Sequence, residues 1–207
     1  VLPMIAGNMA TTADTLEDSP VYGIPVDSLP QPMRLPDRQI VANIVRAIKH
    51  RQKSEIRYSS LTSSDHNESR IIEPHALVNS GLRWHVRAYN EQTYDFRDFV
   101  LSRITDARRL QTAAESSAIY DDDWTESALL QLAPHPGLKP AQQQALLQDY
   151  AAVEGVIELK VRRALAGYVL QKLSVDTTAN HAMNPHAFQL VLINRDEIAS
   201  FAGWAFM

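Results

Sequence analysis

The sequence contains no cysteine, and this absence excludes disulfide bridges and thiolate metal sites. It also lacks an apolar run near the ~18–20 residues that a membrane span requires, and it has no basic-then-apolar signal segment at its start. We therefore expect a cytoplasmic protein.

Motifs for catalysis and metal binding are missing as well. The seven glycines form no phosphate-cradling loop, and the sequence has no HExxH, HxH, GxSxG or SxxK spacing. The acidic run Asp121–Asp123 has no identifiable partner for a metal clamp, so we interpret it as a solvated connector. We expect no enzyme, no metal site and no cofactor.

The charges that are present are distributed unevenly. The net charge is −4 over residues 1–33, +5 over residues 34–110 and −5 over residues 111–207. Residues 83–109 contain six arginines and no lysine. Arginine offers a planar fork that binds phosphate or carboxylate through two hydrogen bonds and stacks on aromatic rings. The central segment therefore favours an anionic ligand.

The N-terminal third predicts a linker followed by a helix. Residues 1–36 hold six of the eleven prolines, which indicates an extended linker with at most a helical turn at residues 12–18. Asp37 is expected to cap a helix from Arg38 to about Arg51 that carries isoleucine and valine at helical spacing. The first residue, a valine, and the apolar C-terminal end suggest a fragment of a longer protein.

Short segments after this helix predict an antiparallel sheet. We expect strands at residues 56–60, 70–78, 82–89 and 93–99, and a last short one at residues 108–111. A polar loop through residues 59–67 follows the first strand. Several short strands close together in sequence favour a small, strongly bent sheet or barrel.

The segment GLRWHVRAYN, residues 81–90, alternates apolar and polar residues as a β-strand does. A three-residue loop at 79–81, with its glycine in the left-handed conformation, aligns the apolar residues of the hairpin on one face. In that register Val78 pairs with Leu82.

This register has consequences for both faces of the hairpin. It places Trp84 in the core, His75 opposite His85 and Glu73 opposite Arg87. Interaction sites are rich in arginine and aromatic residues, so we expect the polar face to bind an anion.

Residues 113–140 are interpreted as a connector, and residues 141–207 as a second, small α+β unit. We expect helices at residues 141–152 and 165–173, strands at residues 156–163 and 187–194, and a final helix from Arg195. Asn194 and Glu197 have the spacing of a capping box at the start of that helix.

Four ordered blocks of the sequence resemble a WYL domain, and most closely that of bacterial transcriptional regulators of phage-defence islands. The blocks are Tyr58–Leu61, Arg70–Val78, Arg83–Tyr89 and Phe96–Ile104, within a match to about residues 40–110. Trp84-His85-Val86 stands where the Trp-Tyr-Leu triplet of the family stands. Residues 141–207 resemble, more weakly, the extension that usually follows a WYL domain.

The resemblance implies a fold and a ligand groove. The fold is α+β, with a small Sm-like, SH3-type β-barrel over residues 37–112 that has an N-terminal helix and is followed by the C-terminal extension. The groove is thought to sense a nucleotide or single-stranded nucleic acid. By position it comprises Tyr58, Ser60, Arg70, His75, His85, Arg87, Arg97 and Arg103.

The resemblance also implies a homodimer that binds operator DNA through an N-terminal winged helix-turn-helix, for which we find no candidate in this chain. We therefore expect the ligand-sensing and dimerisation portion of a DNA-binding transcriptional regulator, with a nucleotide or oligonucleotide effector. Two alternatives stay open. One is a direct single-stranded nucleic-acid-binding module, and the other is a protein-interaction scaffold that senses no ligand.

Overall fold

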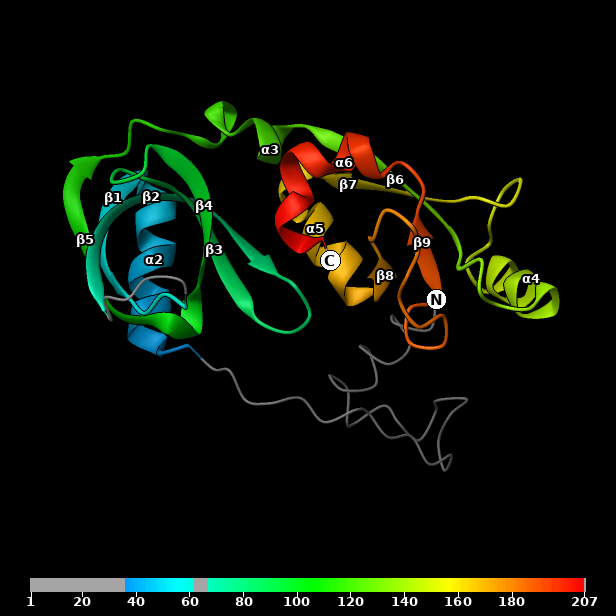
Figure 1. Cartoon of the computed structure of the whole chain (residues 1–207). Helices are drawn as coiled ribbons and strands as arrows, with labels where there is room; N and C mark the ends of the chain where they lie inside the picture. The colour runs from blue at the N-terminus through cyan, green and yellow to red at the C-terminus, as the bar shows by residue number, and fades with distance from the viewer. Residues whose placement is uncertain (1–35, 62–66, 207) are drawn as a thin grey trace, which may run out of the picture. The chain divides into compact units, whose positions relative to one another are not determined.

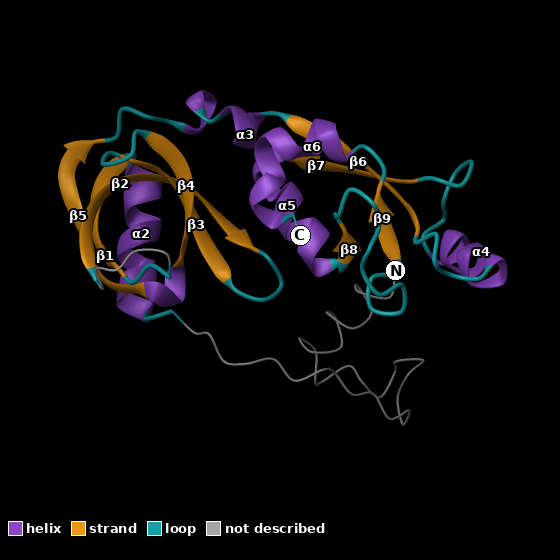
Figure 2. Ribbon diagram, viewed as in Figure 1, coloured by secondary structure: helices purple, strands orange, loops and turns teal. Residues whose placement is uncertain are grey.

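The computed structural model of the protein describes residues 36–61 and 67–206. The predicted linker up to residue 35 and the middle of the polar loop, residues 62–66, lie outside the described residues. The described residues form an α+β fold with one five-stranded and one four-stranded sheet (Figure 1, Figure 2). The α+β class predicted from the sequence is therefore confirmed.

The first helix begins and ends where the sequence predicts. Helix α2 spans Arg38–His50, and the Asp37 carboxylate accepts hydrogen bonds from the backbone N–H groups of Gln39 and Ile40 at 2.7 and 3.1 Å. Arg51 ends the helix in the left-handed conformation. The isoleucine stripe of α2 packs into the core of the first sheet, where Ile44 is fully buried.

The first sheet curves around α2 (Figure 1). Its strands are β1 (Gln52–Tyr58), β2 (Glu68–Asn79), β3 (Trp84–Asn90), β4 (Asp95–Val100) and β5 (Ile104–Ala113). Their order is β4-β3-β2-β1-β5, with antiparallel neighbours throughout. Within the described residues the two edge strands, β4 and β5, do not pair with each other. The sheet is bent but not closed, and the Sm-like barrel expected from the sequence is not confirmed.

The predicted hairpin register between β2 and β3 is wrong. Asn79 pairs with Trp84, so the loop has four residues, 80–83, rather than three. Gly81 does adopt a positive φ, of 85°. A β-bulge at His75 then shifts the register by one residue, which places Ala88 opposite Pro74. The bulge was not predicted because alternation alone does not reveal an inserted residue.

The corrected register changes the neighbours of the polar residues. His85 lies opposite Val78, and Arg87 lies opposite Ala76, not opposite His75 and Glu73. Glu73 instead pairs with Lys53 of β1 at 3.3 Å.

Trp84 is not a core residue, contrary to the prediction. Its exposed fraction is 44%, whereas Val86 and Ala88 on the same face of β3 are fully buried. Within this strand the core cluster begins at Val86, so the hairpin carries Trp84 beyond it.

The second sheet is built from the C-terminal half. It contains β6 (Ser127–Pro134), β7 (Ile157–Arg162), β8 (Val175–Asp176) and β9 (Leu190–Leu192), in the order β7-β6-β9-β8. Its helices are α3 (Asp122–Thr125), α4 (Pro140–Asp149), α5 (Arg163–Lys172) and α6 (Arg195–Ala202). The short 3-10 turns are η2 (Leu101–Arg103), η3 (Ala118–Tyr120) and η4 (Gly203–Ala205). Leucines of β6 and β9 pack with α5 and α6 in a second core.

Strand β6 lies in the segment interpreted as a connector, and it is a central strand of this sheet. It pairs with β7 on one side and β9 on the other. The capping box predicted at Asn194 does not form, because no side-chain hydrogen bond caps α6. The Asn194 side chain donates to the Glu197 carboxylate instead of capping the backbone, and it also donates to the Leu129 carbonyl and accepts from the Gln131 N–H of β6. Tertiary pairing thus overrides a local capping signal.

Helix α5 approaches η4 closely at Gly167. A Cβ at this position would lie 2.5 Å from Cζ2 of Trp204 and 2.9 Å from Cβ of Ala205. We expect Gly167→Ala to lower the free energy of unfolding by about 1–3 kcal/mol, although alanine favours a helix by about 1 kcal/mol. Urea unfolding measures the change. Gly203→Ala is the control, because no atom lies within 4 Å of its Cβ position. Equal stability of the two variants would contradict the close packing.

Candidate ligand-binding cavity

The polar face of β3 is buried rather than solvated. His85 and Arg87 have exposed fractions of 2% and 6%. Both residues belong to a network of side chains from β3, β4, the connector and α5. Burial of ionisable groups is costly unless they are paired, so their partners determine what this face can bind.

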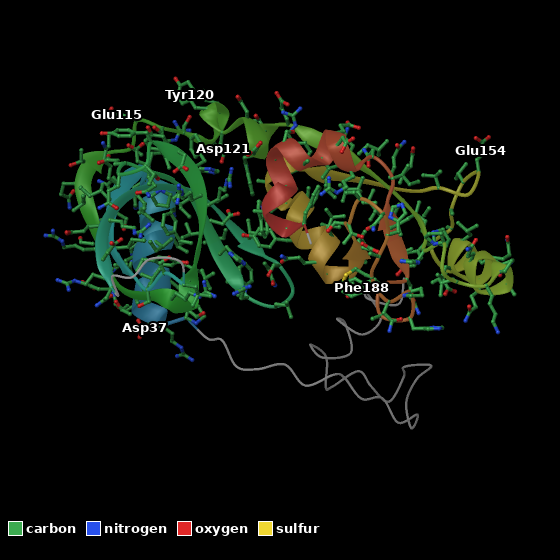
Figure 3. All side chains as sticks on the ribbon, in the orientation of Figure 1. Asp37, Glu115, Tyr120, Asp121, Glu154 and Phe188 are labelled. Atoms are coloured by element: carbon green, nitrogen blue, oxygen red, sulfur yellow. The ribbon has the colours of Figure 1, made fainter. Side chains whose placement is uncertain are left out.

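The main partner of Arg87 is Asp121, which lies in the connector between the two sheets (Figure 3). The guanidinium donates two hydrogen bonds to the carboxylate, from Nε at 2.8 Å and from Nη2 at 2.9 Å. Nε2 of His75, displaced by the β-bulge, lies 2.9 Å from the same carboxylate. Asp121 also caps helix α3.

Burial opposes ionisation of Asp121, but the hydrogen bonds with Arg87 and His75 outweigh it and hold the pKa of Asp121 at about 2. With an exposed fraction of 1%, Asp121 is not the solvated residue that the sequence suggested. The anion that Arg87 requires is therefore supplied by the chain itself. An anionic ligand that bound the same two N–H groups of Arg87 would have to displace Asp121.

A second chain of contacts joins β3 and β4 to helix α5. The Tyr168 hydroxyl donates to Oδ2 of Asp98 at 3.0 Å and lies 3.5 Å from Nδ1 of His85. Arg87 also lies 3.6 Å from Asp98. Burial raises the pKa of Asp98, and burial together with Asp98 raises the pKa of Tyr168. Burial, with the nearby cations Arg83 and Arg103, lowers the pKa of His85 to about 4. The imidazole is neutral at pH 7.

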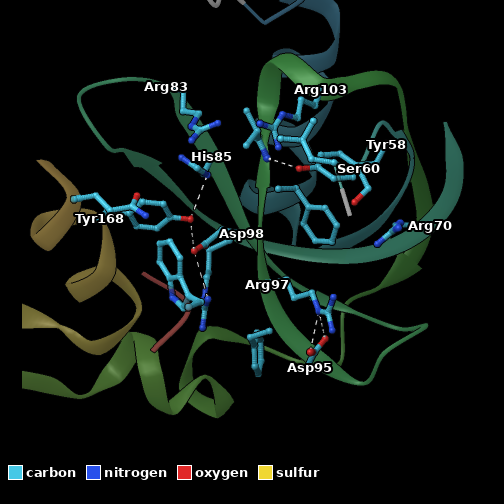
Figure 4. A pocket seen from close by; sticks show the side chains of 17 residues that line it. Tyr58, Ser60, Arg70, Arg83, His85, Asp95, Arg97, Asp98, Arg103 and Tyr168 are labelled. Carbon is cyan, nitrogen blue, oxygen red and sulfur yellow. Dashed lines mark hydrogen bonds and ion pairs between the residues drawn. The ribbon is translucent and has the colours of Figure 1, made fainter. Parts of the chain in front are cut away.

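A cavity of about 830 Å³ opens beside these residues (Figure 4). Seven of the eight side chains predicted from the sequence line it, and His75 does not. The seven are Tyr58, Ser60, Arg70, His85, Arg87, Arg97 and Arg103. They come from β1, the loop after it, β2, β3, β4 and η2, so the curved sheet brings together residues that are far apart in sequence.

The arginines of the cavity differ in how they are paired. Arg70 binds Glu68 at 2.7 Å, and Arg97 binds Asp95 at 2.8 Å. Among the ion pairs of the described residues, Arg83 and Arg103 have no acidic partner. Within the part of the chain that the structure describes, no carboxylate therefore pairs with these two cations.

Several residues that line the cavity were not predicted from the sequence. The most important are Arg83, Asp98, Tyr168, Gln171 and Trp204. Arg83 directly precedes β3 and has the parity of His85 and Arg87, so the alternation of residues 81–90 could have found it. Tyr168 and Gln171 lie on α5, and no local pattern connects that helix to the first sheet.

Where the structure describes the chain, no group of three or more His, Asp or Glu residues could hold a metal ion. In the same residues, no helix is both long and apolar enough to cross a bilayer.

The fold and the cavity define a two-part α+β protein whose parts share one arginine-rich cavity. Residues 39–109 match the WYL domain family, and residues 128–198 match the C-terminal dimerization domain of the BrxR transcriptional regulator. The chain thus belongs to the WYL-domain proteins that carry a BrxR-type C-terminal dimerization domain.

Curated relatives of the chain carry the name DNA-binding transcriptional repressor CapW. The proteins from Escherichia coli (strain KTE188) and Pseudomonas aeruginosa are each 38% identical over 174 residues, which is 84% of this chain and 57% of the relative. The protein from Stenotrophomonas maltophilia is 33% identical over 167 residues, which is 81% of this chain and 55% of the relative. The chain spans little more than half the length of these relatives. They are named as repressors rather than as enzymes, in agreement with the expectation from the sequence.

Among solved structures, Proteasome accessory factor B/C (PafBC) of Arthrobacter aurescens is 18% identical and aligns with a TM-score of 0.36. The alignment covers 89% of this chain and 28% of that protein. At this TM-score the similarity adds nothing to the fold assignment.

Proposed function

We propose that the chain is the ligand-sensing and dimerisation portion of a DNA-binding transcriptional repressor. Its effector is a nucleotide or short nucleic acid that binds in the arginine-rich cavity. Operator DNA is contacted by a winged helix-turn-helix outside these 207 residues, in a homodimer held by the segment that matches the dimerization domain. The repressor name of the relatives and the charge of the cavity support this proposal.

One observation carries the ligand-sensing part. The cavity holds two cations, Arg83 and Arg103, that have no acidic partner among the described residues, while Arg87 is already held by Asp121. We therefore assign the anionic group of the effector to Arg83 and Arg103. Arg87 has a positioning role, because it holds the connector against β3.

The cavity also suggests how a bound ligand acts. Tyr168 and Gln171 belong to the segment that matches the dimerization domain, and they line the cavity together with cations of the WYL domain. A ligand that binds one arrangement of these two parts better than another shifts the population toward it. Such a shift requires that α5 pack differently against β3 in the ligand-bound and ligand-free protein.

Titration calorimetry on the full chain with nucleoside monophosphates and short single-stranded oligonucleotides tests the proposal. We expect Arg83→Ala and Arg103→Ala each to weaken binding about tenfold, because a hydrogen bond to a charged group contributes about 1.5–3 kcal/mol. Arg108→Ala is the matched control, since Arg108 is exposed on β5 and pairs with Glu55 outside the cavity. Absence of binding by every probe, or equal losses in all three variants, would overturn ligand sensing in this cavity.

The salt dependence of binding separates the sensor from a direct nucleic-acid-binding module. A ligand held by two arginines changes log K by about two units or less per tenfold change in salt, because few counterions are released. A slope of five or more with a long oligonucleotide would favour the direct module. The same calorimetric titrations at 50 and 200 mM salt provide this comparison.

A further inference from the structure

Two hydrogen-bonding atoms at one end of the cavity lack a partner among the described residues. They are Nε2 of His85 and Oδ1 of Asp98, and both are buried. Both residues line the cavity, and Figure 4 shows them beside the Tyr168 hydroxyl. Buried polar atoms in folded proteins are nearly always paired with protein or water, so these two atoms take their partners from water or from a ligand.

The hydrogen-bond directions determine which kind of ligand atom fits. The Tyr168 hydroxyl gives its proton to Asp98, so only its lone pairs are left to face His85. Nδ1 of His85 must then carry the imidazole proton, because two lone pairs facing each other at 3.5 Å would be repulsive. Since the ring is neutral at pH 7, Nε2 is left as an acceptor. Carboxylate oxygens such as Oδ1 of Asp98 are acceptors as well.

We propose that His85 and Asp98 form a donor-selective subsite, which accepts N–H or O–H groups of the ligand while Arg83 and Arg103 hold its anionic group. This inference rests on the proposed function and names the ligand class more closely. The class is an anion whose other end presents hydrogen-bond donors, such as a nucleotide with an amino group on its base. A ligand that turns a carbonyl oxygen toward these atoms leaves both acceptors unpaired, and it is rejected for that reason.

The tautomer of His85 is measured directly by long-range ¹H–¹⁵N correlation spectra of the full chain at pH 7 without ligand. We expect the shift of a protonated nitrogen at Nδ1 and that of an unprotonated nitrogen at Nε2. The His85→Phe variant assigns the signals, since they disappear in it. A proton on Nε2 would overturn the donor-selective subsite and leave the cationic half of the cavity intact.

Paired ligands test selectivity. Guanosine and inosine 5′-monophosphates differ by one amino group, as do adenosine and purine riboside 5′-monophosphates. We expect at least one amino-bearing ligand to bind about tenfold or more tightly than its partner, and this ratio to fall to about one in His85→Phe. His50→Gln is the control, because His50 is exposed at the end of α2 and outside the cavity.

The outcomes distinguish the two proposals. Ligands that bind equally with and without the amino group would overturn the subsite alone. Failure of every nucleotide to bind would overturn the proposed function, and the tautomer would still determine whether Nε2 is an acceptor.

Discussion

Replacement of Asp121 by alanine is expected to lower the free energy of unfolding by about 3–5 kcal/mol. The side chain of Arg87 is 7% exposed and is held by this carboxylate through two hydrogen bonds. Without Asp121 the guanidinium stays buried with only the more distant Asp98 and Asp123 nearby, at 3.6 and 3.9 Å. A buried charge that loses its closest partner costs far more than the pair contributes.

Urea unfolding followed by circular dichroism measures this effect, with Asp95→Ala as the matched control. Asp95 pairs with Arg97 at 2.8 Å on the surface, where such a pair contributes about 0–1 kcal/mol. Adding Arg87→Met to Asp121→Ala should recover part of the loss, because the uncompensated charge is then gone. A loss below about 1 kcal/mol in Asp121→Ala would show that the connector is not held by this pair.

Titration of His85 by itself is expected to lower the free energy of unfolding by about 2 kcal/mol as the pH falls from 6.5 to 4. In the folded chain the pKa of this ring is lowered from 6.5 to about 4 by burial and by Arg83 and Arg103. The Tyr168 hydroxyl lies 3.5 Å from Nδ1 of the ring and donates to Asp98. Between these pH values the unfolded chain binds a proton that the folded chain does not, so acid favours unfolding. The contribution is complete above pH 6.5.

The full difference in pKa corresponds to about 3 kcal/mol, and screening by solvent reduces the value we expect to about 2 kcal/mol. Unfolding curves at pH 4, 5, 6 and 7 measure the slope. In His85→Phe this component should be absent, whereas His50→Gln should retain the slope of the unchanged protein. Parallel slopes in all three proteins would mean that His85 titrates alike in the folded and unfolded chains.

Much of the first sheet could be predicted because its signals are local. These signals depend only on residues close together in the sequence. They are the Asp37 cap, the apolar stripe of α2 and the alternation of β3. All five strands of this sheet occur near their predicted places. The predicted register failed at the hairpin loop, which has four residues instead of three, and the bulge at His75 shifted it again. Neither a longer loop nor an inserted residue changes the alternation of the flanking residues.

Part of the cavity lining could be predicted, because its residues belong to short sequence blocks. Seven residues of the polar face and its neighbours could be assigned because the sequence blocks carry a family resemblance and β3 alternates. Their pairing could not be assigned. Nothing near Arg87 in the sequence indicates that its guanidinium would bind the carboxylate of Asp121, which lies 34 residues away.

The sequence by itself determined the fold class, the helix at Asp37, the strands of the first sheet and the concentration of arginine on one strand face. Only the tertiary structure decided which of those arginines carry charge available to a ligand. The physical reason is that a side chain's chemical type is local, whereas its partners and its burial depend on segments brought together by folding. Asp121 of the connector binds Arg87, Tyr168 of α5 lies beside His85, and Arg83 and Arg103 have no acidic partner among the described residues.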